Sequence, residues 1–313
     1  MGRVQNPTFS FFCTKHETTF NESSPMRPCC FAGPVLPGGT ARGFLQSVGG
    51  VPCYVADEQG ALTDSSTPCL VMAPDVFGIS QHARLLADEM NRRSGGQPVV
   101  LVDYFEGTAL SATVMECLLP FSMPALPGAP PRSLLGKACA FFGAVRAFLS
   151  VLPTLLPFVW RHLLPAHKAA KLPLVGAVAA ELCGEGGERK LGLVGYCYGG
   201  DAALHFNALP GSPFGATAVA HGKVTLPQVG ALLRPALFVC ADNDFAFPER
   251  RVLQAEALVR ARPDYSEARF RFRRYPGTYH GFAIRGDERN EVVEKAKGAA
   301  LDEAIDFFKM ALL

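Results

Sequence analysis

The chain has 313 residues, of which 49% are apolar and 19% are charged, with a formal net charge of +2 at pH 7. Acidic and basic residues are well mixed, which gives no reason to expect a nucleic-acid partner. The length is enough for a large core, and α/β folds of this size commonly form a single domain.

The first predicted element is a Pro- and Ser-rich leader over residues 1–40, which has few periodic apolar positions and is expected to pack loosely. It lacks the continuous apolar run of a secretory signal. Its first 16 residues contain Arg3 and Lys15 but no acidic residue, so a mitochondrial leader remains the alternative to a cytoplasmic protein. A short β hairpin is expected next, between Gly43 and Ala56.

An alternation of strands and helices then begins. Leu70 to Ala73 reads as a core strand, Ser80 as the cap of a helix that runs to Arg93, and Val99 to Tyr104 as the next strand. Apolar strands and amphipathic stretches continue to alternate as far as Leu313, where the chain is expected to end in a helix that begins near residue 291. This order predicts an α/β fold with a mostly parallel, doubly wound sheet, within one domain over residues 41–313.

Residues 118–180 interrupt the alternation, because they contain no acidic residue, six basic residues and many prolines. Their longest uncharged run, Ala147 to Trp160, holds two prolines and is shorter than the roughly 20 residues that span a bilayer. We therefore expect no transmembrane segment but a helical insertion, a set of short helices between strands of the sheet, that forms a cap beside the candidate active site described below. An apolar, cationic cap would favour an anionic or lipophilic substrate. A cap that only covers the core and one that binds a membrane surface are the alternatives.

The most informative segment is Gly195-Tyr196-Cys197-Tyr198-Gly199-Gly200, between an apolar run and a predicted helix over residues 201–208. A strand, a sharp turn and a helix with flanking glycines form a nucleophile elbow, which places the side chain of Cys197 over the end of the sheet. The N-terminus of the helix favours a thiolate there. Because a free cysteine is often only a small buried hydrophobe, a base and an orienting acid are also needed.

Two later loops supply them in the chain order nucleophile, acid, histidine. The strand over residues 236–241 is followed by Asp242 and Asp244, and the strand over residues 270–275 is followed by His280. At one edge of a parallel sheet, His280 would take the Cys197 proton while a carboxylate fixes its tautomer. Asp244 is preferred to Asp242 because the spacing Asp-x-x-x-Pro places it at the apex of its loop.

The remaining histidines and cysteines give weaker signals. His221 ends a strand after the elbow helix, where a structural role is favoured over one in lining the pocket. No cysteines have the spacing Cys-x-x-Cys and no histidines the spacing His-x-x-x-His, so no metal site is predicted. Most cysteines lie in apolar runs and read as buried thiols, which suggests a reducing, cytoplasmic compartment.

These motifs resemble the dienelactone hydrolase (carboxymethylenebutenolidase) family of α/β hydrolases. The matching segments cover the chain from about residue 45 to its end: residues 73–79, 102–107, 195–200, 244–248 and 280–286. The resemblance implies a catalytic triad of Cys197, His280 and Asp244 that hydrolyses a small-molecule ester or lactone without a cofactor. It also implies an oxyanion hole made by the backbone N–H groups of Tyr198 and Val76.

Two further residues are compared with the family pattern. Asp75 stands where bacterial members have a glutamate that holds the resting thiol and releases it as thiolate, and the shorter side chain leaves that role open. Arg285 lies where a family arginine grips the substrate carboxylate, and its alternative is a solvated arginine beside Asp287 and Glu288. The second hypothesis for the whole chain is a non-catalytic scaffold that binds a ligand or a protein partner, and a redox-sensing thiol ranks third. The sequence does not indicate an oligomeric state.

Overall fold

The structure is a computed structural model that describes residues 39–111, 114, 134–184, 186–187, 189–286 and 290–312. The expected leader lies outside these residues apart from Gly39 and Thr40, and so do residues 118–133 of the expected insertion.

An eight-stranded sheet forms the centre of the described chain, in the order β1-β2-β4-β3-β5-β6-β7-β8. The pairs β1–β2 and β2–β4 are antiparallel, and the other neighbouring pairs are parallel. Every residue of β3, β4 and β5 is buried, as expected for parallel strands covered on both faces. The strands are β1 (Phe44–Val48), β2 (Val51–Ala56), β3 (Cys69–Ala73), β4 (Val99–Val102), β5 (Leu191–Tyr196), β6 (Phe214–Ala220), β7 (Ala236–Asn243) and β8 (Phe270–Tyr279).

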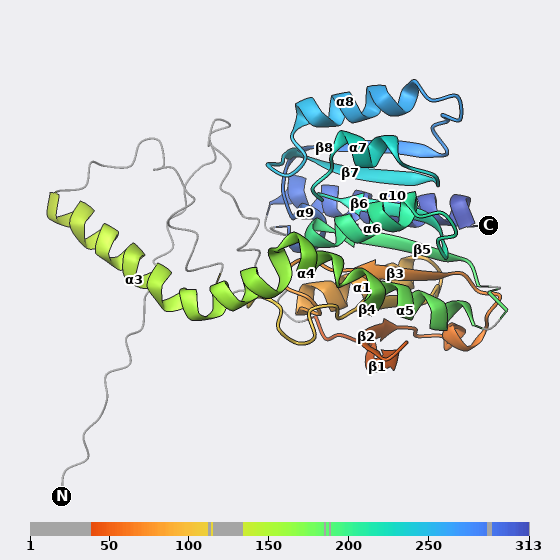
Figure 1. Cartoon of the computed structure of the whole chain (residues 1–313), viewed down its shortest axis with the longest axis horizontal. Helices are drawn as coiled ribbons and strands as arrows, with labels where there is room; N and C mark the ends of the chain where they lie inside the picture. The colour runs from red at the N-terminus through yellow and green to blue at the C-terminus, as the bar shows by residue number, and fades with distance from the viewer. Residues whose placement is uncertain are drawn as a thin grey trace, which may run out of the picture.

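Helices cover both faces of the sheet (Figure 1). Apolar residues of α1, α9 and α10 share one core cluster with the sheet, and those of α5, α6, α7 and α8 share the other. The helical elements are η2 (Ala61–Thr63), α1 (Gln81–Arg93), α3 (Leu134–Phe158), η3 (Val159–Leu163), α4 (Pro165–Ala169), α5 (Leu172–Cys183), η4 (Cys197–Gly199), α6 (Gly200–Ala208), α7 (Leu226–Gly230), α8 (Glu249–Arg260), α9 (Phe282–Arg285) and α10 (Glu291–Leu312). The predicted α/β fold with a mostly parallel, doubly wound sheet is confirmed.

Most local predictions also agree with the structure. The hairpin is β1 and β2, and the Ser80 hydroxyl caps α1 by accepting a hydrogen bond from the Ala83 N–H at 3.4 Å. The predicted end of the last strand at Tyr275 is wrong, because β8 continues to Tyr279. The continuation pairs Tyr279 with Asn243 across an irregularity in β7, so partner contacts extend a strand that the Pro-Gly sequence suggested would stop.

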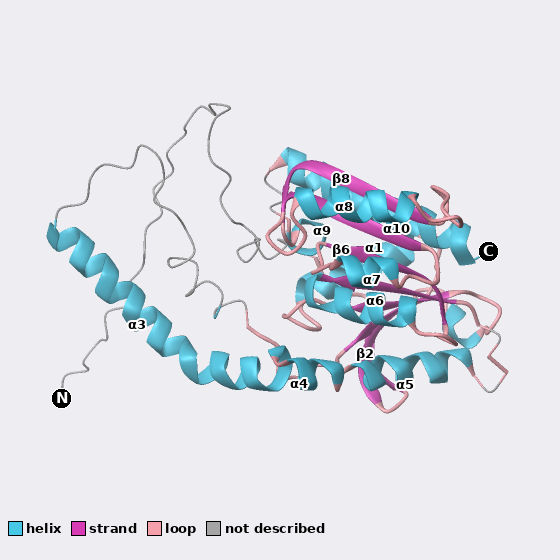
Figure 2. Cartoon of the chain, turned by 45° about the horizontal axis from the view of Figure 1, so that its top comes forward, coloured by secondary structure: helices cyan, strands magenta, loops and turns pink. Residues whose placement is uncertain are grey.

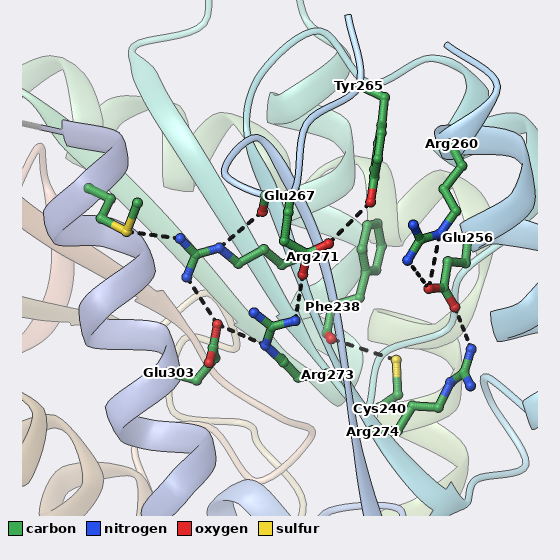
Figure 3. Close-up of polar contacts among 11 residues, drawn as sticks. Phe238, Cys240, Glu256, Arg260, Tyr265, Glu267, Arg271, Arg273, Arg274 and Glu303 are labelled. Carbon is green, nitrogen blue, oxygen red and sulfur yellow. Dashed lines mark hydrogen bonds and ion pairs between the residues drawn. The ribbon is translucent and has the colours of Figure 1, made fainter.

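The edge strand β8 carries charged side chains along its length (Figure 3). Arg271 and Arg273 both contact Glu303 of α10, at 3.0 and 3.2 Å, and Arg273 also pairs with Glu267 at 2.6 Å. Arg274 pairs with Glu256 of α8. Charged groups on an edge oppose pairing with a strand of another molecule, because the charges would have to be desolvated.

The described part of the insertion is one long helix followed by shorter ones, whereas only short helices were expected. Helix α3 has 25 residues and contains Pro153 and Pro157, each of which removes one backbone N–H donor without ending the helix here. Figure 2 shows α3, α4 and α5 following one another, with most of α3 projecting beyond the sheet. Among the described residues no single helix is long and apolar enough to cross a bilayer, although the bent pair Phe148–Leu163 and Pro165–Cys183 meets that criterion together.

Candidate active site

Cys197 lies at the apex of the turn between β5 and α6, in the strained backbone conformation that an elbow requires. Its φ is +50°, a left-handed value that non-glycine residues seldom adopt. Glycines surround it because there is no room for side chains. A Cβ on Gly195 would lie 2.2 Å from the Gly199 carbonyl oxygen, and one on Gly199 would lie 2.2 Å from that of Ala73. The side chain of Cys197 is thereby presented at the carboxyl end of the sheet and is partly exposed.

Cys197, His280 and Asp244 form a hydrogen-bonded line. The Cys197 sulfur lies 3.1 Å from Nε2 of His280, and Nδ1 of the same ring lies 2.8 Å from Oδ1 of Asp244. The three residues follow β5, β7 and β8, whose carboxyl ends meet at one edge. The structure therefore brings together the three side chains that the sequence singled out, although they are separated by up to 83 residues.

Asp242, the other carboxylate considered for this position, lies elsewhere. Its Oδ2 accepts a hydrogen bond from the Gly277 N–H at 3.1 Å and so supports the C-terminal end of β8. Asp244 is 5% exposed, and its Oδ1 also accepts from the backbone N–H groups of Ala246 and Phe247, at 2.7 and 3.3 Å. These bonds fix the carboxylate in the orientation that meets His280.

The environment of His280 favours its charged form. Burial lowers the pKa of the imidazole, but the hydrogen bonds to Asp244 and Cys197 and the charges of those two groups outweigh burial and raise the pKa to about 10. A protonated ring donates from both nitrogens, and both nitrogens have an acceptor here. At neutral pH His280 therefore holds a proton against the Cys197 sulfur.

Asp75 and Arg285 form a buried ion pair close to this line. Nε of Arg285 donates to Oδ2 of Asp75 at 2.9 Å, and the two residues are 4% and 3% exposed. The guanidinium also donates to Oγ of Ser80 at 3.0 Å and lies 3.7 Å above the ring of Phe77. The alternative of a solvated arginine is therefore wrong, because α9 turns Arg285 toward the turn after β3, while Asp287 and Glu288 lie outside the described residues.

The turn after β3 also contains Val76, one of the two residues expected to supply oxyanion-stabilising N–H groups. β3 and β5 are paired neighbours, with Ala73 opposite Gly195, so this turn lies against the elbow. The close approach of Gly199 to the Ala73 carbonyl reflects the same packing. Tyr198, the other expected residue, follows Cys197 directly in η4.

Residues of the insertion contact Tyr198 directly. The Tyr198 hydroxyl donates to the His162 carbonyl at 2.6 Å, and Nε2 of His162 lies 2.9 Å from Oγ1 of Thr108. Because the Thr108 hydroxyl donates to the Phe105 carbonyl, it accepts a hydrogen bond from Nε2 of His162. Burial, followed by the charges of Lys171 and Arg161, lowers the pKa of His162 to about 4, so the ring is neutral.

Lys168 of α4 is the second contact of the insertion with the elbow. Its ammonium group pairs with Asp201, and it lies 4.6 Å from the centre of the Tyr198 ring. Burial lowers the pKa of Lys168, while charge on Cys197 acts in the opposite direction. The sequence identified the insertion as a region but singled out neither Lys168 nor His162, since both contacts depend on how α4 and η3 fold back onto the elbow.

His221 packs against the ring of His280. The two ring centres are 5.2 Å apart in an edge-to-face arrangement, and His221 is 1% exposed. Burial, with a smaller contribution from His280, holds the pKa of His221 well below its usual range. Its φ of +41° marks a second strained residue at the carboxyl edge of the sheet. The buried, neutral ring is a packing partner of His280, in line with the structural role favoured from the sequence.

The other described cysteines differ from Cys197. Burial raises the pKa of Cys53 and Cys69 to about 12, and it raises the pKa of Cys183 and Cys240 as well. No group of three or more histidines, cysteines or carboxylates suited to a metal ion occurs in the described part of the chain.

Comparisons with known proteins agree with the family resemblance and with the fold. Residues 169–312, which include Cys197, Asp244 and His280, match the model of the dienelactone hydrolase family. Hydrolase pyvD of Aspergillus violaceofuscus is 23% identical over 93% of this chain and 98% of its own length. The human carboxymethylenebutenolidase homolog is 29% identical, over 37% of this chain and 45% of its own length.

A solved structure supports the fold. The putative dienelactone hydrolase of Klebsiella pneumoniae has 18% sequence identity and a TM-score of 0.54, over 83% of this chain and 92% of that one. At this identity the likeness establishes the fold rather than the chemistry. The resemblance predicted from the motifs is confirmed: residues 169–312 match the dienelactone hydrolase family, and the fold resembles that of the Klebsiella protein.

Proposed function

We propose that the protein is a cysteine-dependent hydrolase of esters or lactones, with Cys197 as nucleophile, His280 as acid and base, and Asp244 as the residue that orients His280. The observation that carries this proposal is the pair of contacts from His280, 3.1 Å to the Cys197 sulfur and 2.8 Å to Asp244. A nucleophile in reach of a base, and a base held by a third group, is the arrangement that acyl transfer requires.

The first half of the reaction forms a thioester. The sulfur of Cys197, whose proton passes to His280, attacks the substrate carbonyl, and the electron pair of the C=O bond moves to oxygen. The backbone N–H groups of Tyr198 and Val76 would stabilise that oxyanion, the interaction that commonly contributes most to such a barrier. When the intermediate collapses, the bond to the leaving oxygen breaks, and protonated His280 gives that oxygen its proton.

The second half regenerates the enzyme. After His280 has given its proton to the leaving oxygen, its ring is neutral. Thioester formation removes the charge from sulfur, one of the causes that raise the pKa of His280, so the ring stays unprotonated and can accept a proton. It takes a proton from water as the water oxygen attacks the thioester carbonyl. Collapse releases the carboxylic acid and returns the electron pair to the sulfur, which again faces a protonated imidazole. In a lactone, acid and alcohol leave as one molecule.

Asp75 and Arg285 are proposed to shape the substrate site rather than to carry out the proton transfers. The Asp75 oxygens accept from Arg285 and, at 3.0 Å, from the Phe77 N–H, which fixes the turn that presents the Val76 amide. Arg285 is engaged with protein groups on three sides, so its effect on an anionic substrate would be exerted through Asp75 and this turn. An anionic or lipophilic ester remains the proposed substrate class.

The proposal is tested by measuring hydrolysis of a panel of aryl esters and lactones by the wild-type protein and by Cys197→Ala and His280→Ala variants. Turnover that both substitutions reduce to the uncatalysed rate supports the hydrolase. Equal rates in all three proteins would favour a non-catalytic scaffold. Trapping the thioester by mass spectrometry, and its loss in Cys197→Ala, identifies the nucleophile directly.

A further inference from the structure

The C-terminal half of α3 and the following η3 are apolar on two opposite faces. One face, with Val151, Leu155, Phe158 and His162, packs against the fold, and Phe158 and His162 contact the ring of Phe105. A helix on a protein surface normally exposes polar residues on the side away from the core. Here that side is apolar too.

The outer face consists of residues that recur at alternate intervals of four and three, so they line one side of the helix. It is defined here as Leu149, Pro153, Leu156, Trp160 and Leu163. All five are exposed, and the exposed fraction is 56% for Leu149, 60% for Leu156, 66% for Trp160 and 43% for Leu163. A contiguous row of large exposed apolar side chains marks a contact surface.

The charge of this region points to the partner. No acidic residue occurs from Leu134 to Ala180, whereas Lys137, Arg146, Arg161, Lys168 and Lys171 do. Arg146 and Arg161 are exposed and flank the outer face on one side of the helix. An apolar face with a tryptophan, bordered by basic residues and free of acids, has the character of a helix that lies in the headgroup region of an anionic bilayer.

The rest of the fold decides between lying on a bilayer and crossing it. The segment that would complete a bent span, α5, buries Val175, Val178, Ala179 and Leu182 in the core cluster it shares with the sheet. It is therefore committed to the fold, whereas most of α3 projects beyond the sheet in the described part of the chain (Figure 2). We propose that the outer face of α3 and η3 binds the surface of anionic lipid membranes. Binding would bring His162 and Lys168, the insertion residues that contact Tyr198, close to lipid.

Trp160 makes the proposal directly measurable, because it is the single tryptophan of the chain. We expect its fluorescence emission to move to shorter wavelength when the full-length protein is mixed with vesicles of phosphatidylcholine and phosphatidylglycerol, and to be quenched by lipids brominated near the headgroup. Vesicles of phosphatidylcholine alone should produce a weaker change, and added salt should reverse part of the binding to anionic vesicles.

Matched variants separate the apolar contribution from the charge. Leu156→Ser with Leu163→Ser should lower the partition coefficient at least about tenfold, since leucine burial contributes most of the affinity. Leu253→Ser with Leu258→Ser, which replaces leucines that are 49% and 40% exposed on α8, should leave it unchanged. Arg146→Gln and Arg161→Gln should each weaken binding to anionic vesicles about fivefold, while Lys309→Gln on α10 should not.

Three results would overturn the proposal. One is a Trp160 emission that anionic vesicles do not change. Another is equal binding by the α3 and α8 leucine variants, both with native circular dichroism. The third is an emission maximum already at short wavelength without vesicles, together with a dimer in sedimentation, since a second copy of the chain would then cover the outer face. If the leucine variant fails to fold, quenching of the wild-type protein and the arginine variants still decide the question.

Discussion

Arg285 and Asp75 are joined by a 2.9 Å ion pair between buried side chains that are 210 residues apart in sequence. The pair joins the short helix α9, which follows His280, to the turn after β3. Strand β3 is the neighbour of β5, which leads into the elbow. Two of the loops that form the candidate site are thus fixed to each other by one contact.

Substitution Arg285→Ala is expected to destabilise the protein by about 3–5 kcal/mol, because it leaves the Asp75 carboxylate buried without its cation. Thermal or denaturant unfolding measures this loss. Arg273→Ala is the matched control, since Arg273 pairs at the solvated β8 edge with its side chain 37% exposed, and its loss should cost about 1 kcal/mol or less. A similar small effect of both substitutions would contradict the structural role given to Arg285.

The pH dependence of hydrolysis is expected to follow His280. Its pKa is raised to about 10, so the proton that it gives to the leaving oxygen is present at neutral pH and is lost as pH rises through about 10. Activity should therefore persist through the weakly alkaline range and fall above it. The protonated ring also contributes to the free energy of unfolding. This contribution is complete below the unfolded pKa of about 6.5 and is lost as pH rises through about 10.

Asp244→Asn should lower the upper limit of that pH profile, because Asp244 is one of the groups that raise the pKa of His280. The rate at neutral pH should also fall, by roughly 10²–10⁴. Asp242→Asn is the control, since Asp242 bonds to the Gly277 N–H instead. A profile that Asp242→Asn shifts and Asp244→Asn does not would reverse the assignment of the acid.

Gly199→Ala is expected to destabilise the fold by roughly 2–3 kcal/mol, since the added methyl group meets backbone rather than a movable side chain. The nearest atom, the Ala73 carbonyl oxygen, would lie 2.2 Å away. In contrast, a Cβ added to Gly143 of α3 would have no neighbouring atom within 4 Å. Gly143→Ala should therefore stabilise the helix by about 1 kcal/mol. Chemical denaturation of the two variants gives the comparison, and equal effects would argue against the tight elbow.

Tyr198→Phe tests the contact between the insertion and the elbow. Without the hydroxyl, the His162 carbonyl loses the hydrogen bond of 2.6 Å that it accepts from Tyr198. The free energy of unfolding is expected to fall by about 1–3 kcal/mol, because the His162 carbonyl is left buried without its donor. The emission of Trp160, two residues before His162, should respond as the contact between the insertion and the elbow loosens. Tyr265→Phe, at a hydroxyl that bonds to exposed Glu267, is the control and should be nearly neutral.

The sequence was sufficient for the features that depend on local pattern. Glycines at 195 and 199 mark the elbow because each lacks room for a side chain, and polar residues after β7 and β8 reach one sheet edge because parallel strands end together. Asp244 could be preferred to Asp242 only on loop spacing. The hydrogen bond between Asp242 and Gly277 distinguishes Asp242 from Asp244 in the structure. It depends on a strand whose partner residue lies 35 positions further along the sequence.

The remaining features depend on contacts that sequence does not display locally. Arg285 precedes Asp287 and Glu288 and so resembled a solvated residue, yet its partner Asp75 lies at the other end of the chain. Strand β8 passes through Pro276 and Gly277 because pairing with β7 continues beyond them. Helix α3 likewise continues through Pro153, since one missing N–H donor does not outweigh the remaining helical hydrogen bonds.

The burial of the other described cysteines gives Cys197 a chemical distinction. Cys53, Cys69 and Cys240 are buried and Cys183 is half-buried, and desolvation raises the pKa of each of these thiols. Cys197 is half-buried too, but it lies beside the imidazolium of His280. Among these five thiols an electrophilic reagent or an oxidant would therefore meet one reactive partner. The same arrangement that suits the proposed thioester chemistry makes this position the one at which covalent damage, or a covalent inhibitor, would act first.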